Sequence, residues 1–99
     1  MPYEYHTDPG HGWLAVPDVE LALLGLSGSI SGYSYQRGSV VYLEEDCDMS
    51  KFLEAKLALA GLGGTERLAA VGEWWRKHVI PVDHAQDCFV RRLARYQGR

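Results

Sequence analysis

The sequence predicts one small α+β domain, with a small mixed or antiparallel sheet and two to three helices packed on one side. Three observations predict it. The 99 residues suffice for one hydrophobic core but not for two. Short runs typical of strands are mixed with longer runs of helical periodicity. These runs lack strict β-α-β alternation, which favours antiparallel or mixed strand pairing with the helices on one face.

The N-terminal segment predicts two short strands joined by a tight turn. Residues 3–6 and 12–16 carry aromatic and aliphatic side chains that are typical of strands. Between them lies an Asp-Pro-Gly triplet at residues 8–10, which is strong turn chemistry. We expect Asp8 to form this turn by accepting hydrogen bonds from backbone N–H groups.

A short helix and a loop are expected next. Asp18 can cap a helix over residues 19–24, and Gly25 can end it. Two leucines three residues apart share one face of this helix, which we expect to meet the core. Residues 27–32 contain three Ser and two Gly, which predicts a loop.

The clearest local signal is a β-hairpin with a two-residue turn at residues 37–38. This register places Tyr35 opposite Val40 and Tyr33 opposite Tyr42. Because side chains alternate along a strand, these four share one face and the aliphatic residues between them point to the other. The hairpin is therefore expected to have an aromatic face and an aliphatic face.

Two longer helices are expected in the second half of the chain. Asp48 can cap a helix over about residues 49–60, and Thr65 can cap another over about residues 66–77. Each has an apolar stripe at helical spacing. The two stripes comprise Met49, Phe52, Leu53, Leu57, Ala60, Leu68, Val71 and Trp75.

The C-terminal part predicts an edge strand, a second short strand and a basic tail. Residues 79–82 form the edge strand, because Pro81 cannot donate a hydrogen bond to a neighbouring strand. Residues 88–90 are expected to form a last short strand. The tail over residues 91–99 is rich in arginine.

Three stretches of the chain form a specific pattern. They read His-Thr-Asp-Pro-Gly-His-Gly-Trp-Leu from residue 6, Tyr-Ser-Tyr from residue 33 with Tyr-Leu-Glu-Glu-Asp-Cys-Asp from residue 42, and Arg-Arg-Leu-Ala-Arg-Tyr from residue 91. This pattern resembles a family of small uncharacterised bacteriophage and mobile-element proteins. The resemblance implies a setting, the cytoplasm of a phage-infected or lysogenic bacterium, and a small fold of the kind predicted above. It implies no reaction.

Composition narrows the classes of partner. The net charge of −3 gives no general attraction to nucleic acid or to an anionic membrane. The N-terminus lacks a signal peptide pattern, and no apolar run approaches the roughly 20 residues of a membrane helix. Cys47 and Cys88 have no metal-pair spacing, and we expect two reduced thiols. We therefore expect a cytoplasmic protein without a membrane partner.

The first turn contains the first candidate site. His6, Asp8 and His11 carry imidazole and carboxylate groups, which are plausible zinc or iron ligands, and the turn can bring them together. Their spacing fits no known metal signature, so we expect ordinary hydrogen bonding and keep metal binding as the alternative. Asp83 and His84 are an adjacent acid and base, but neighbours on a strand point to opposite faces.

The acidic segment after the hairpin is the second candidate. Glu44, Glu45, Asp46 and Asp48 can bind Mg²⁺ or Ca²⁺, or tune one another for acid–base chemistry. The segment lacks the ligand spacing of an EF-hand, and a solvated acidic loop with a helix cap also explains it. If the segment is functional, imitation of a phosphate backbone fits better than catalysis. Cys47 lies among these acids, which predicts a raised thiol pKa and a poor nucleophile.

Two further groups of residues are candidates for recognition. Arg91 and Arg92 can contact phosphates, and Tyr96 can stack on a base. Trp74 and Trp75 are adjacent on a helix and point about 100° apart. We place Trp75 on the buried line, which leaves Trp74 as an interface anchor. The alternative is that both rings pack in the core.

We therefore predict a non-enzymatic protein-interaction module of phage or mobile-element origin that binds a host or phage protein complex. Inhibition of a host defence complex is one form of this function. No cofactor is expected. The expected interaction surface comprises Tyr33, Tyr35, Tyr42, Glu44, Glu45, Asp46, Trp74, Arg91 and Arg92. One alternative is a small metal-dependent enzyme built on His6, Asp8, His11 and the acidic segment. Another is a nucleic-acid-binding protein that uses the C-terminal arginines.

Overall fold

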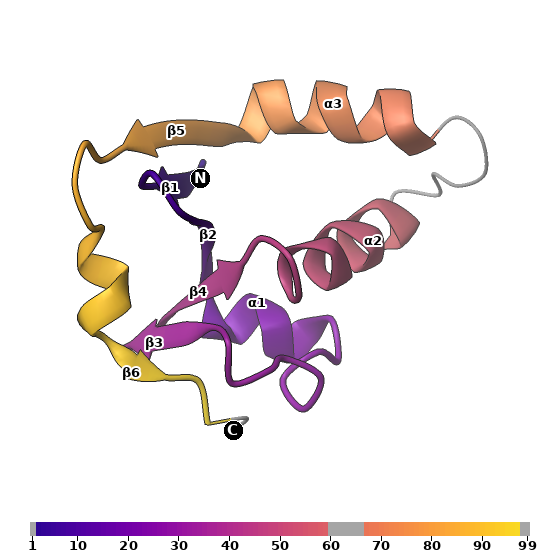
Figure 1. Ribbon diagram of the computed structural model, residues 1–99. Helices are drawn as coiled ribbons and strands as arrows, with labels where there is room; N and C mark the ends of the chain where they lie inside the picture. Colours follow the sequence, from indigo (N-terminus) through magenta and orange to yellow (C-terminus); the bar gives the residue numbers. More distant parts are fainter. Residues whose placement is uncertain (1, 60–66, 98–99) are drawn as a thin grey trace.

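The computed structural model describes residues 2–59 and 67–97. Within these ranges six strands form one mixed sheet in the order β5-β1-β2-β4-β3-β6 (Figure 1). β1 and β5 run parallel, and the other neighbouring strands run antiparallel. The predicted α+β class is confirmed. In chain order the elements are β1 (Tyr3–Thr7), β2 (Gly12–Pro17), α1 (Asp18–Leu23), β3 (Tyr35–Arg37), β4 (Val40–Glu44), α2 (Met49–Leu59), α3 (Arg67–His78), β5 (Val79–Asp83), the 3-10 helix η2 (Phe89–Arg92) and β6 (Ala94–Arg95).

α1 shows how the local sequence sets a helix boundary. The helix begins at Asp18 itself, and its N-cap makes no side-chain hydrogen bond, so the predicted capping role of Asp18 is wrong. The helix ends before Gly25, as predicted, and Gly25 adopts φ = 73°. The N–H of Gly25 donates to the carbonyl of Ala22, and that of Leu26 donates to Leu21. This is a Schellman motif, which satisfies carbonyls that the helix end leaves unpaired.

The predicted hairpin is formed by β3 and β4, but its register differs by two residues from the prediction. Tyr35 pairs with Tyr42, and Arg37 pairs with Val40. The two-residue loop of the hairpin therefore consists of Gly38 and Ser39. Gly38 has φ = 60°, whereas no residue other than glycine has a positive φ in the described chain. A hairpin turn of type II′ needs glycine at its first central position, which explains the observed register.

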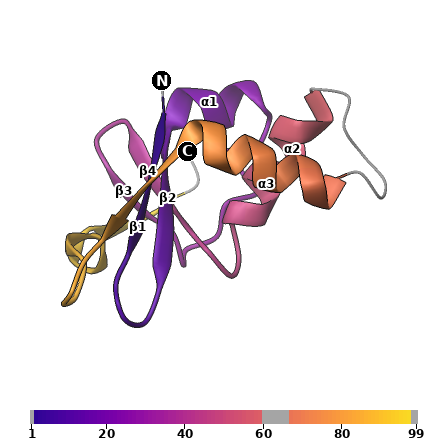
Figure 2. The same ribbon diagram turned by 90° about the horizontal axis from the view of Figure 1, so that it is seen from above.

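Both faces of the sheet are covered. Figure 2 shows α1, α2 and α3 on one side of the strands and η2, which belongs to the C-terminal segment (residues 84–95), on the other. The helix side holds an aliphatic core whose fully buried residues include Leu14, Val16, Leu21, Val41, Leu43 and Phe52. On the other side Trp13 and Tyr42 pack with Cys88 and Val90 from the C-terminal segment. The aromatic face of the hairpin is thus largely a second core.

The C-terminal segment departs most from the prediction. β5 is an edge strand, as predicted. Residues 88–90 do not form a strand, because Cys88 precedes η2 and its carbonyl accepts the N–H of Arg91 within that 3-10 turn. The chain then adds the short strand β6 beside β3, which the sequence did not predict. None of the helices in residues 2–59 and 67–97 combines the length and apolar character that a membrane crossing requires.

The two longer helices begin near their predicted positions. α2 starts at Met49, yet the carboxylate of Asp48 bonds to Ser31 and Ser34 in the preceding loop, so its predicted capping role is wrong. The predicted cap Thr65, the end of the first stripe at Ala60 and the side chain of Leu68 lie outside the described parts of the structure.

The tryptophan pair packs against β1. The rings of Trp74 and Tyr3 lie 5.5 Å apart, and those of Trp75 and Tyr5 lie 5.1 Å apart. Both tryptophans are half-buried against the helix-side core. Both rings pack in part against the core, as the alternative expects, and the role of Trp74 as an interface anchor stays a prediction.

Candidate binding cleft

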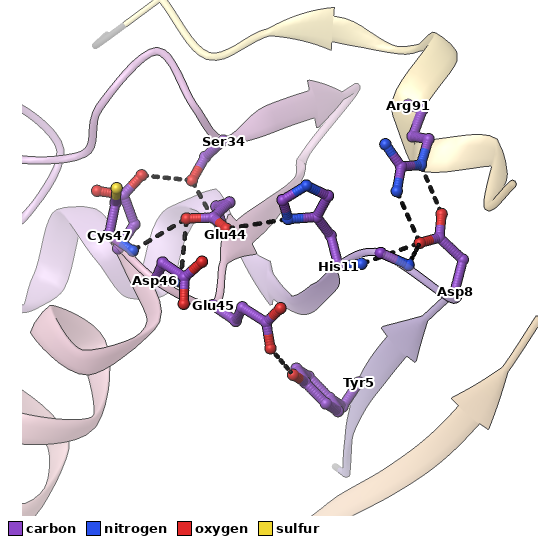
Figure 3. Close-up of polar contacts among 11 residues, drawn as sticks. Tyr5, Asp8, His11, Ser34, Glu44, Glu45, Asp46, Cys47 and Arg91 are labelled. Carbon is purple, nitrogen blue, oxygen red and sulfur yellow. Dashed lines mark hydrogen bonds and ion pairs between the residues drawn. The ribbon is translucent and has the colours of Figure 1, made fainter.

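Asp8 forms the first turn and also holds the C-terminal segment on the sheet. Its Oδ1 accepts the backbone N–H groups of Gly10 and His11, each at 3.0 Å, as predicted. Arg91 donates from Nε to Oδ2 at 2.6 Å and from Nη2 to Oδ1 at 2.8 Å (Figure 3). The N–H of Cys88 donates to Oδ2 at 2.9 Å. The fully buried Asp8 side chain thus accepts five hydrogen bonds.

This pair sets the charge state of both partners. The Arg91 hydrogen bonds, joined by the three backbone N–H donors, hold the pKa of Asp8 far below its ordinary value of 3.8, although burial opposes the shift. The same contact raises the pKa of Arg91. Arg91 is therefore a structural cation, and two of the five N–H donors of its guanidinium are used by Asp8.

Glu44 shapes the acidic segment. Its Oε1 accepts the backbone N–H groups of Asp46 and Cys47, each at 3.0 Å, and its Oε2 lies 3.7 Å from Nδ1 of His11 (Figure 3). The pKa of the Cys47 thiol is raised, first by partial burial and then by the neighbouring Glu44 carboxylate. The predicted direction of this shift is confirmed, with burial as the larger cause.

Glu45 serves a structural contact with β1. Its Oε2 accepts a hydrogen bond of 2.8 Å from the hydroxyl of Tyr5 (Figure 3). The Tyr5 ring lies directly over Gly12, where a Cβ would come within 2.2 Å of the hydroxyl oxygen. A side chain at position 12 would therefore displace the Tyr5 hydroxyl from its present position.

Asp48 is buried and anchors the loop before the hairpin. It accepts hydrogen bonds from the N–H and hydroxyl of Ser31, from the hydroxyl of Ser34 and from Nζ of Lys51. Burial opposes ionisation, but these donors outweigh it and lower the pKa of Asp48. The Ser34 hydroxyl also accepts the N–H of Glu44, which ties the loop to the end of β4.

These contacts together build a cleft of about 430 Å³ between the end of β4 and the C-terminal segment. Residues predicted as an interaction surface form much of its lining, namely Tyr33, Tyr35, Glu44, Asp46 and Arg91. The lining is completed by His11, Trp13, Cys47 and Arg95.

Aromatic rings and guanidinium groups form part of the cleft lining. The guanidinium of Arg91 lies 5.4 Å from the ring centre of Trp13, and that of Arg95 lies 5.3 Å from that of Tyr35. Tyr33 lies outside the hairpin strands and is 63% exposed. The indole N–H of Trp13 is buried without a hydrogen-bond partner among the described residues.

Other predicted site residues lie elsewhere. Tyr42 is 5% exposed, so it cannot belong to an accessible recognition surface. Arg92 is exposed on η2 and does not line the cleft, and Trp74 lies on α3. Tyr96 is buried and donates its hydroxyl to the carbonyl of Ser27 at 2.6 Å, so the prediction that it stacks on a base is wrong.

His6, Asp8 and His11, the alternative metal ligands of the first turn, do not come together as one group. Asp8 is occupied by Arg91 and backbone donors, and the two histidines enter different groups of candidate ligands. Within the described ranges, one group comprises His6, His84 and Cys88, and the other comprises His11, Glu44, Glu45 and Asp46. In each group the ligand atoms lie within 4.8 Å of one another. The sequence analysis missed the link between His6 and His84, which are 78 positions apart.

Comparison with models of known protein families, with curated proteins and with solved structures finds no match to this chain. The resemblance to bacteriophage and mobile-element proteins therefore stays a prediction. What the chain does is inferred from its own geometry.

Proposed function

We propose that this chain is a non-enzymatic interaction module whose cleft binds a basic segment of a partner protein. One observation carries the proposal: the exposed ring of Tyr33 and the carboxylates of Glu44 and Asp46 line the same cleft. Its volume of about 430 Å³ falls within the range of roughly 300–1,000 Å³ that is typical of ligand sites. That space accommodates one or two side chains of a bound segment.

The charges of the cleft favour a cationic ligand. The charge of Arg91 is balanced by the buried carboxylate of Asp8. Arg95 is the remaining arginine of the lining, which also contains two acids, Glu44 and Asp46. Asp46 is exposed, so its carboxylate is available to a ligand. The chain as a whole carries a net charge of −3, which favours approach of a basic partner.

The chemistry of the lining suits arginine or lysine. A cationic side chain gains a charge-assisted hydrogen bond from a carboxylate and a cation–π contact from a tyrosine ring. Tyrosine is also enriched at recognition sites, because it combines apolar area with a hydroxyl.

The chemistry of the partner follows from this preference. Surfaces rich in arginine and lysine are typical of proteins that bind nucleic acid. An acidic module that covers such a surface competes with the phosphate backbone. Inhibition of a host nucleic-acid-binding complex is therefore the activity that we propose, and it agrees with the mobile-element setting that the resemblance implies.

Fluorescence anisotropy of labelled peptides tests the proposal. An arginine-rich peptide should bind at low salt, and a glutamate-rich peptide of equal length should not. Asp46→Asn should weaken binding by about 1 kcal/mol, or roughly five-fold, as expected for a partly exposed charge-assisted contact. Asp87→Asn is the matched control, because Asp87 is 81% exposed and does not line the cleft. Equal losses in the two variants, or no binding of the basic peptide, would contradict the proposal.

The second group of candidate ligands favours one alternative function. His11, Glu44 and Asp46 line the cleft, and Glu45 offers a ligand atom within 4.8 Å of theirs. Oxygen-rich sets of this kind suit Mg²⁺ or Mn²⁺. A cation there would support the predicted metal-dependent enzyme. Calorimetric titration with Mn²⁺ distinguishes the two functions. The metal-dependent enzyme predicts saturable Mn²⁺ binding that Asp46→Asn removes, whereas the interaction module predicts no saturable binding.

A further inference from the structure

A second group of side chains converges beneath the C-terminal segment, apart from the cleft lining. His6 lies on β1, His84 follows β5, and Cys88 precedes η2. One ligand atom from each lies within 4.8 Å of the others. Cys88 is fully buried and His6 is 6% exposed. Two imidazoles and a thiol are thus gathered in a site that is largely shielded from water.

The fold itself brings these three residues together. β5 pairs in parallel with β1, so that Val82 lies beside His6. The N–H of His84 then donates to the carbonyl of Thr7 at 2.7 Å, which extends the pairing by one residue. Four residues later the N–H of Cys88 is fixed by the Asp8 carboxylate. Each ligand therefore sits on a backbone position that is held by hydrogen bonds.

The geometry of the two imidazoles suits a tetrahedral metal ion. Nδ1 of His6 lies 3.0 Å from Nε2 of His84. Zinc–nitrogen bonds of about 2.0–2.1 Å at a tetrahedral angle place two nitrogens about 3.3 Å apart. The observed nitrogen–nitrogen distance is a few tenths of an ångström shorter, so metal binding would require only a small movement of the two side chains. The ring centres of the two histidines lie 5.3 Å apart.

Glu4 supplies the outer contact that metal-binding histidines commonly have. Its Oε1 lies 3.0 Å from Nε2 of His6, the ring nitrogen that faces away from His84. A carboxylate in this position accepts the Nε2 proton, which leaves the lone pair of Nδ1 for a metal ion and fixes the ring. Such an arrangement holds His6 in the tautomer that ligation requires.

We propose that His6, His84 and Cys88 bind one divalent transition-metal ion of the zinc type. A set of two nitrogen ligands and one sulfur ligand suits Zn²⁺, and Cys88 loses its thiol proton when the ion binds. Three protein ligands leave the fourth tetrahedral position to water. The ion fastens the C-terminal segment to β1, and that segment also carries the arginines of the cleft. A metal-free core can contain the same hydrogen bonds, so the test must detect the metal–sulfur bond itself.

Cobalt titration of the chelator-treated full chain provides that test. Co²⁺ bound to a thiolate gives a sulfur-to-metal charge-transfer band in the near ultraviolet. We expect this band to saturate at one equivalent and to disappear when Zn²⁺ is added. Cys88→Ser should abolish it. Cys47→Ser is the matched control and should retain it, because Cys47 belongs to neither ligand group.

Two further variants keep the test decisive if Cys88→Ser fails to fold. Glu4→Gln should lower the affinity for cobalt by about ten-fold or more, because it removes the outer contact of His6. His84→Gln alters a half-buried ligand and should lower that affinity further. His11→Gln should bind cobalt as the unmodified chain does. The proposal is overturned if the folded unmodified chain gives no charge-transfer band, if the band depends on Cys47, or if His84→Gln leaves cobalt affinity unchanged.

Discussion

The contact between Asp8 and Arg91 should contribute strongly to stability, and Asp8→Asn tests it. The substitution preserves the shape of the side chain but removes its charge. The side chain of Asp8 is fully buried, and two of its five hydrogen bonds come from Arg91. The side-chain amide of asparagine has one acceptor oxygen in place of two, so it cannot accept all the hydrogen bonds that Oδ1 and Oδ2 of Asp8 accept. The guanidinium of Arg91 would then lose its counter-ion while it remains two-thirds buried.

The magnitude follows from these contacts. Hydrogen bonds to charged groups contribute about 1.5–3 kcal/mol each. The lower value applies here, because Arg91 is 32% exposed and solvent screens its charge. Loss of two such bonds gives about 3 kcal/mol, at the lower end of the range for a broken buried pair. In a domain of this size that loss lowers the melting temperature by about 12–24 °C.

Urea denaturation at neutral pH measures the change directly. Asp87→Asn is the control, because Asp87 lies 4.0 Å from the same guanidinium but is 81% exposed. We expect it to change the free energy of unfolding by less than about 0.5 kcal/mol. If Asp8→Asn costs no more than Asp87→Asn, the buried pair does not hold the C-terminal segment and the interpretation of the fold on this face is wrong.

The pH dependence gives a second signature of the same contact. The pKa of Asp8 is lowered below 3.8 in the folded chain, chiefly by Arg91. A lowered folded-state pKa contributes stability above the unfolded-state pKa and loses it as pH falls through the folded value. The stability difference between the unmodified chain and Asp8→Asn should therefore be full at neutral pH and shrink below about pH 4. A difference that is constant down to pH 2 would contradict the assignment.

Two further substitutions test the contacts that shape the cleft. Gly12→Ala should cost about 1–3 kcal/mol by overpacking, because its Cβ would meet the hydroxyl of Tyr5 at 2.2 Å; an unchanged urea midpoint would refute the close contact. Ser34→Ala should cost about 1–3 kcal/mol, because it removes a buried donor to Asp48 and an acceptor for a backbone N–H. Ser50→Ala, at an exposed site on α2, is the control and should be neutral within about 0.5 kcal/mol in thermal unfolding.

Local chemistry explains which elements could be predicted. Glycine at position 25 ends α1, and proline at position 81 marks the edge strand. The hairpin was also identified, because its strands alternate and a glycine lies between them. Its register was wrong, because the prediction placed Gly38 second in the turn, whereas its positive φ is required at the first position.

Contacts between distant parts of the chain explain what could not be predicted. Asp8 and Arg91 are 83 positions apart, and neither residue carries a local signal of the other. The sequence pattern shows that Tyr42 and its neighbours alternate between two faces. It does not show that the C-terminal segment covers the aromatic face. For the same reason the sequence analysis placed His6 with His11, and only the parallel pairing of β1 with β5 brings it to His84.

Mapping of the bound peptide by NMR tests the proposed function most directly. Backbone amide signals of the ¹⁵N-labelled chain are followed while the arginine-rich peptide is added. We expect the largest shifts at residues 33–35, 44–47 and 91–95, which surround the cleft, and small shifts on α1. Shifts concentrated on the helices, or spread evenly over the chain, would contradict a basic-segment site in this cleft.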